Sequence, residues 1–202
     1  MYMNIRHQYY LSNLIKNKIK NEFKNIYILG GGNYKVGDAL STQDVYKYLG
    51  GKTKILTYPL LTKYNNLDDL LDPYNNIVIL YLTREKFGHY CALVKRKGKI
   101  CFFDSYGGNK KPDEQLEFIN DHFRLKSNQD FPHLTKLLYE SKYPVEYNEH
   151  QYQEKGPHIA TCGYHCVNFI KSGLDIDQYY KKMKQLKKKY NKSFDELVVD
   201  LI

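Results

Sequence analysis

Three strongly apolar runs between residues 76 and 104 constrain the fold most. Residues 76–82 read Asn-Ile-Val-Ile-Leu-Tyr-Leu, a run that is typical of a central strand buried on both faces. Residues 88–94 and 99–104 form two further strand-like runs, and the polar, glycine-containing segment 95–98 separates them. The sequence therefore predicts a central strand followed by a β-hairpin.

The register of this hairpin determines which polar side chains meet. A symmetric turn over residues 95–98 pairs Val94 with Lys99 and puts His89 opposite Asp104. Directly opposed residues have Cβ atoms roughly 4.5–5.5 Å apart, within reach of an imidazole–carboxylate contact. A three-residue turn with a bulge at Gly98 would instead shift the pairing by one residue.

Other segments have helical spacing or strand-like composition. Helices are predicted at residues 12–24, 41–49, 67–71, 112–123, 131–138, 162–170 and 176–190, and extended segments at 53–61 and 144–147. With 202 residues the chain is long enough for one well-buried core, so we expect a single domain over residues 1–202. Within it we expect residues 1–35 to form an N-terminal extension, flexible or packed, and residues 175–202 a basic C-terminal helical segment.

Hydropathy and cysteine content narrow the class of protein. The longest strongly apolar run, residues 77–82, is far below the roughly 20 residues of a membrane-spanning helix. Residues 1–7 lack the apolar core of a signal peptide, and four cysteines without such a signal favour reduced thiols in a cytosol-like compartment. We therefore expect a monomer that neither spans a membrane nor is secreted.

A formal net charge of +9 favours contact with polyanions or acidic surfaces. The predicted helix at residues 176–190 carries a run of lysines between positions 181 and 189. Such a run is either a solvated helix face or a patch that binds nucleic acid, and both interpretations remain open here.

Cys162 follows a turn-prone lead-in, and apolar residues recur after it at helical spacing, so it is predicted to begin a helix. Unpaired N–H groups and the positive end of the helix dipole lower the pKa of a thiol there and favour a nucleophilic thiolate. The alternative is a buried, inert cysteine.

Thiol catalysis needs a thiolate, an imidazole, a group that orients the imidazole, and donors for the oxyanion. Cys162, His89 and Asp104 fit the first three roles. The backbone N–H of Cys162 can supply one oxyanion donor, and a side-chain amide from Gln153 or Gln151 can supply another.

Three motifs in this order resemble one family of enzymes. They are Gly88-His89-Tyr90, Phe103-Asp104-Ser105-Tyr106-Gly107, and the segment from Gly156-Pro157 through Cys162-Gly163-Tyr164-His165-Cys166. Together they resemble the adenovirus endopeptidase (adenain) and SUMO-protease group of cysteine proteases, with greatest similarity to maturation proteases of virophages and other double-stranded DNA viruses.

The resemblance implies an α+β fold, with a mixed central β-sheet packed by helices and the nucleophilic cysteine at the N-terminus of a central helix. It implies catalytic residues His89, Asp104, Gln153 and Cys162, and cleavage of capsid or virion precursors after small, glycine-type residues. Tyr90 stands where the family has Trp. Gln153 lies nine residues before the cysteine rather than six or seven, so an insertion must be assumed.

The resemblance also bears on cofactors, partners and location. No cofactor is expected to be required, although DNA or a basic peptide activates adenain and is a candidate activator here. Substrate precursors, and double-stranded DNA at the basic C-terminal helix, are the expected partners, in the virion and the host-cell cytoplasm where viral factories form. The glycines at 30–32 form either a turn or a self-cleavage signal.

Other functions fit parts of the pattern. The same thiol site would suit a protease that removes ubiquitin-like modifiers, or an acyltransferase, whereas the charge would suit a non-catalytic DNA-binding virion protein. No metal site is predicted, because His165 turns away from the face of Cys162 and Cys166 and no Cys-x-x-Cys pair is present.

Overall fold

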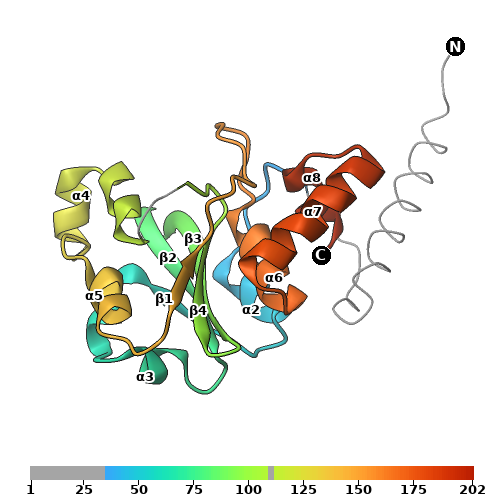
Figure 1. Ribbon diagram of the computed structural model, residues 1–202. Coiled ribbons are helices and arrows are strands. Elements are labelled where there is room, and N and C mark those ends of the chain that lie inside the picture. Colours follow the sequence, from blue (N-terminus) through green and yellow to red (C-terminus); the bar gives the residue numbers. More distant parts are fainter. Residues whose placement is uncertain (1–34, 109–111) are drawn as a thin grey trace, which may run out of the picture.

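The computed structural model describes residues 35–108 and 112–202 of the chain. A mixed five-stranded sheet forms its centre, and Figure 1 shows this sheet between two groups of helices. The strands are β1 (Lys54–Thr57), β2 (Asn76–Arg84), β3 (Phe87–Arg96), β4 (Lys99–Asp104) and β5 (Val145–Tyr147), and they lie side by side in this order. β2, β3 and β4 pair antiparallel, whereas β1 and β5 pair in parallel with β2 and β4. The expected α+β fold with a mixed sheet is therefore confirmed.

The β3–β4 hairpin turn is tighter than the sequence predicted. Arg96 pairs with Lys99, so only Lys97 and Gly98 form the turn. Both have positive φ, 49° and 75°, as a two-residue type I′ turn requires. This register pairs Asp104 with Cys91, so the prediction that His89 lies directly opposite Asp104 is wrong.

Helices cover both faces of the sheet (Figure 1). One face packs against α2 (Thr42–Tyr48), α6 (Cys162–Ser172), α7 (Ile176–Tyr190) and α8 (Phe194–Asp200). The other face packs against α3 (Leu67–Leu71), α4 (Asp121–Lys126), α5 (His133–Tyr139) and the 3₁₀ helices η1 (Tyr58–Lys63) and η2 (Pro112–Phe118). Alternate residues of the strands feed the two cores, as period-two side-chain alternation requires.

Most helix predictions hold, and the differences have local causes. The helices predicted at 67–71 and 176–190 have the predicted bounds, and Ser41 caps α2 through a capping box with Asp44. The helix predicted over 112–123 is instead η2 and α4, because Asn120 adopts an extended conformation and caps α4. Only residues 54–57 of the segment 53–61 form a strand, since Pro59 lies in the first turn of η1. The helix predicted at 12–24 and the glycines at 30–32 lie outside the described residues.

α6 lies deep between the sheet and α8. Its residues 163–169 are all buried, and Gly173 ends it in the left-handed conformation with φ 66°. A Cβ atom at Gly163 would lie 3.1 Å from the Cβ of Leu40, so glycine lets the first turn approach its neighbour closely. This packing fixes the position of Cys162. Within residues 35–108 and 112–202, none of the helices combines the length and apolarity that a bilayer crossing would require.

Candidate active site

A cavity of about 990 Å³ opens at the end of the sheet where β3 and β4 meet the start of α6. Its wall includes three of the four predicted site residues, His89, Gln153 and Cys162, together with Tyr106. Residues at the start of α2, on β2 and β3, at the end of η2 and in the segment before α6 complete it, among them Ala39, Leu40, Ser41, Thr42, Leu80, Phe87, Gly88, Phe118, Ile159 and Ala160. Residues as far apart in the sequence as Ala39 and Cys162 thus face one space.

His89 and Asp104 are bonded to each other despite the corrected register. The Nε2 atom of His89 lies 2.7 Å from Oδ1 of Asp104, and only 11% and 5% of the two side chains are exposed. The same carboxylate oxygen accepts the backbone N–H of Tyr106 at 2.9 Å. Because β3 and β4 pair Cys91 with Asp104, the imidazole reaches the carboxylate diagonally across the strands.

The ring of Tyr106 packs against one face of the His89 imidazole. The two rings are stacked, with the centroids 4.7 Å apart and the planes at 19°. Asn148 supports the same strand end, because its amide donates to the backbone carbonyl of Asp104 at 2.6 Å. With Nε2 engaged by Asp104, Nδ1 is the ring nitrogen of His89 that remains for Cys162, and each of these two side chains shifts the pKa of the other.

The electrostatics of this pair favour a thiolate and an imidazolium. Burial alone would raise the pKa of the Cys162 thiol, but the hydrogen bond and charge of His89, with backbone hydrogen bonds at Tyr90 and Gly163, lower that pKa below its ordinary value. Burial opposes protonation of His89, but the charge of Asp104 and the hydrogen bonds to Asp104 and Cys162 raise its pKa well above the ordinary value. Both shifts have the directions that a reactive cysteine requires.

Of the two candidate glutamines, Gln153 is the one at the cavity. It is only 1% exposed, Ser105 Oγ donates to its Oε1 at 2.8 Å, and its Nε2 lies 3.5 Å from the carbonyl oxygen of Ile159. Gln151 is exposed, and its side chain donates to the backbone carbonyl of Gln153 at 3.0 Å. The longer spacing before Cys162 is therefore compatible with an amide at this cavity.

Gly107 brings two loops of the site together. It has φ 60°, and a Cβ atom there would lie 2.3 Å from the backbone of His150. The neighbouring Gly108 donates its N–H to the carbonyl oxygen of Glu149 at 2.9 Å. The loop after Asp104 therefore lies directly against the segment that leads to Gln153.

The structure also places the other cysteines. Cys91, Cys101 and Cys166 are buried, and all four cysteines are free thiols. Among the described residues, His89, Cys91 and Asp104 have ligand atoms within 4.8 Å of one another and could hold a metal ion. A metal there would have to replace the His89–Asp104 hydrogen bond, and burial raises the pKa of Cys91 to about 12, which disfavours the thiolate that would bind it.

The sequence does not reveal several supporting contacts. Tyr106 lies within one of the three motifs, but its stacking on His89 has no sequence signal, and neither does the contact of the Tyr90 hydroxyl with Thr42 Oγ1 at 3.0 Å. Asp195, on α8, was missed altogether, although it bonds to His165 and to Thr161 next to Cys162. No sequence motif connects a residue of α8, the last helix of the chain, with a site around Cys162.

No protein-family model matches this chain. A curated relative does: the chain is 40% identical over 162 residues to "Uncharacterized protein V9" of Sputnik virophage, which covers 79% of this chain and 91% of that protein. The chain belongs to the V9 family. It is therefore a virophage-related viral protein. The name of V9 assigns that protein no activity.

Proposed function

We propose that this V9-family protein is a cysteine endopeptidase that cleaves capsid or other virion precursors after small, glycine-type residues during maturation. The observation that carries the proposal is the convergence of the Cys162 thiol, the His89–Asp104 pair and the Gln153 amide at one cavity. The resemblance to adenain-type proteases supports the preference for small residues, and the virophage relative supports a substrate among virion proteins.

In the first half of the reaction, the Cys162 thiolate attacks the scissile carbonyl carbon and forms a C–S bond. The carbonyl oxygen becomes an oxyanion, which the Cys162 backbone N–H at the start of α6 and the Gln153 side-chain amide stabilise. His89, held as an imidazolium by Asp104, gives its proton to the leaving amine as the C–N bond breaks.

In the second half, a water molecule attacks the resulting thioester. His89, now neutral, takes one proton of that water, the C–S bond breaks, and the carboxylate product leaves. Asp104 keeps the imidazole in the tautomer that carries hydrogen on Nε2, so that the other ring nitrogen is the base. Tyr106, stacked on the ring, prevents its rotation during both steps.

The test is co-expression of the protein with the major capsid precursor of its virus. The wild-type protein should release products whose new C-terminus is a small residue, as read by mass spectrometry. Cys162→Ala and His89→Ala should abolish the cleavage. Cys101→Ala is the matched control, since it removes a buried thiol of β4 that does not line the cavity. Cleavage that persists in Cys162→Ala would refute the proposal.

The same experiment separates the rival enzymes. Release of a Gly-Gly-ended modifier from a conjugate, with intact capsid precursor, would make the protein a deconjugating protease. Transfer of an acetyl group from acetyl-CoA to Cys162 would make it an acyltransferase.

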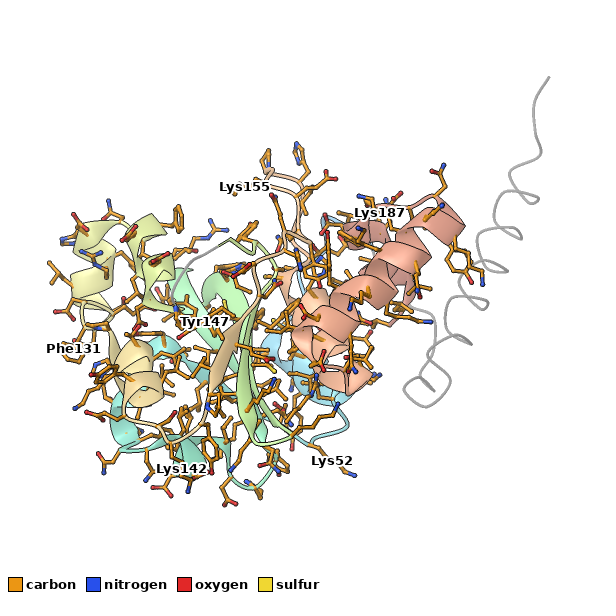
Figure 2. The ribbon with its side chains drawn as sticks, viewed as in Figure 1. Lys52, Phe131, Lys142, Tyr147, Lys155 and Lys187 are labelled. Atoms are coloured by element: carbon orange, nitrogen blue, oxygen red, sulfur yellow. The ribbon has the colours of Figure 1, made fainter. Side chains whose placement is uncertain are left out.

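A DNA-binding function has one specific observation in its favour. α7 presents exposed lysines at positions 181, 184, 187, 188 and 189, and Figure 2 shows Lys187 on this helix. Binding to double-stranded DNA that weakens steeply with salt, without labelling of Cys162 by a peptide-based thiol probe, would favour a non-catalytic role. Both properties together would make DNA a partner of the protease.

A further inference from the structure

We propose that Asp195 is a positioning residue that holds together the two chain segments forming the oxyanion hole. The inference rests on the proposed protease function and extends it to a residue 33 positions after the nucleophile. Asp195 lies in the first turn of α8, and it contacts neither the cavity nor a reacting atom.

Asp195 bonds to a neighbour of each oxyanion donor. Its Oδ1 accepts the hydroxyl of Thr161, the residue directly before Cys162. Its Oδ2 accepts the backbone N–H of Glu154, the residue directly after Gln153, at 3.0 Å. One carboxylate therefore connects the start of α6 to the Gln153 segment.

A third donor completes the carboxylate's environment. The Nε2 atom of His165 lies 3.0 Å from Oδ1 of Asp195, and both side chains are almost completely buried. Burial opposes ionisation of Asp195, but the donors at His165, Thr161 and Glu154 lower its pKa, so the carboxylate is charged. Burial lowers the pKa of His165, which keeps that ring neutral despite its contact with Asp195.

Fold stability alone does not explain a buried charge at this position. Leu197, Val198 and Val199 already pack α8 into the core, and Ser193 and Glu196 cap the helix. Replacing a buried ionic group by an apolar one of similar size is often neutral or stabilising, so a buried carboxylate is not the simplest way to secure a helix. Its three hydrogen bonds instead fix the distance between two loops.

That distance matters because an oxyanion donor acts only within a narrow range, about 2.7–3.1 Å from the oxygen that it stabilises. Misplacement of a reacting group by about 1 Å can reduce a rate on the order of 100-fold. Without Asp195 the direct link between Thr161 and Glu154 would be lost, and the Gln153 amide, held then mainly by Ser105, would shift relative to the Cys162 N–H. His89 is held separately, by Asp104 and Tyr106.

The test compares reactions that do and do not use an oxyanion hole. Variants Asp195→Asn and Thr161→Val remove parts of the link, Thr161→Ser keeps the hydroxyl, and Asp200→Asn is the matched control. Asp200 is a buried carboxylate on the same helix that pairs with Lys192, away from the cavity. Each variant is assayed for kcat and KM on a peptide containing the identified cleavage site, for inhibition by the corresponding peptide aldehyde, and for alkylation of Cys162 by iodoacetamide.

We expect kcat to fall about 10- to 100-fold in Asp195→Asn and Thr161→Val, with KM changed less than about threefold. The aldehyde, which forms a tetrahedral adduct, should lose affinity in parallel with kcat. Alkylation, which forms no oxyanion, should keep its rate within about twofold. Thr161→Ser should recover most of the loss, and Asp200→Asn should show neither change.

Equal losses of alkylation and turnover would overturn the inference, as would the same loss in Asp200→Asn. If Asp195→Asn does not fold, the Thr161→Val and Thr161→Ser pair decides, because the two differ in the hydroxyl. If the wild-type protein neither cleaves nor alkylates, the proposed function fails separately. Faster amide exchange at Glu154 and Cys162 in Asp195→Asn than in Asp200→Asn would still support the link, and equal exchange would refute it.

Discussion

Two histidine–aspartate pairs lie near the start of α6, and they differ in what surrounds the second ring nitrogen. His89 bonds to Asp104 at 2.7 Å, and its ring also reaches Cys162 at the cavity. His165 bonds to Asp195 at 3.0 Å, is fully buried, and its Nδ1 has no hydrogen-bond partner among the described residues. The first pair has access to a reacting group, and the second does not.

The difference appears as opposite changes of pKa. Burial opposes protonation of both rings. At His89 the charge of Asp104 and the bonds to Asp104 and Cys162 outweigh burial and raise the pKa, whereas at His165 burial prevails and lowers the pKa. The same two residue types therefore make a proton donor at the cavity and a neutral structural donor in the core. The protonation state of each ring depends on whether its second nitrogen has a polar partner and on whether the ring is accessible to water.

The largest difference between the two pairs should appear when each histidine is replaced by alanine. His89→Ala should reduce peptide cleavage on the order of 10⁴-fold, since the general base and acid is lost, while the unfolding midpoint in urea changes little. His165→Ala should instead destabilise the fold by about 2 kcal/mol, because it leaves a buried carboxylate short of one donor. Steady-state rates and urea titrations of both variants check this. Equal rate losses in the two folded variants would contradict the assignment.

The next test concerns the side-chain amide of Gln153 at the cavity. Gln153→Ala should lower kcat about 10²- to 10³-fold, the effect of removing one oxyanion donor. Gln151→Ala is the matched control and should change kcat less than about threefold, because that side chain is exposed and outside the cavity. Single-turnover kinetics on the same peptide provide the measurement. A larger loss of kcat in Gln151→Ala than in Gln153→Ala would assign the oxyanion donor to Gln151 instead.

The pKa shifts predict how alkylation of Cys162 depends on pH. A thiol whose pKa is lowered stays ionised below the ordinary value of about 8.5, so the alkylation rate of wild-type Cys162 by iodoacetamide should rise at a lower pH than that of an ordinary cysteine. His89→Gln removes the main influence that lowers this pKa, so the inflection should move to higher pH and the rate below the inflection should fall. His165→Gln should leave the inflection in place, and a shift there would refute the distinction between the rings.

The smallest expected effect concerns the ring that stacks on His89. Tyr106→Leu removes an aromatic contact of about 0.5–1.5 kcal/mol, and kcat should fall roughly three- to tenfold as the imidazole gains freedom. Tyr106→Phe keeps the ring and loses only the hydroxyl that accepts from Gln153 Nε2 at 3.4 Å, so it should retain more of the wild-type kcat than Tyr106→Leu. Comparison of kcat for the two variants isolates stacking from the hydroxyl. Equal losses would assign the effect to the hydroxyl.

The sequence predicted the antiparallel part of the sheet well, because the runs at β2, β3 and β4 are long and strongly apolar. The sequence correctly predicted that His89 and Asp104 come into contact, but it predicted the wrong pairing register between β3 and β4. The four-residue turn was assumed from polarity, whereas positive φ at Lys97 and Gly98 allows two residues to suffice. The contact survived since imidazole and carboxylate also meet diagonally.

Other features could not be predicted because no local pattern encodes them. The 3₁₀ helices have no apolar period of the kind that identifies α-helices, and α8 was expected only as part of the helical segment 175–202, without bounds of its own. Gln153 was expected at the site through the family resemblance, but its hydrogen bond to Ser105, at the end of another strand, has no signal in the sequence. Asp195 reaches Thr161 and Glu154 only after α7 and α8 have folded back over α6.

The close approach at Gly107 has a consequence for anyone who recombines this protein with its relatives. Because the backbones of residues 107 and 150 nearly touch, a graft of either loop alone would bring mismatched main chains into collision. Residues 104–108 and 148–153 must therefore be exchanged as one module. Libraries that diversify the cavity wall should leave position 107 constant.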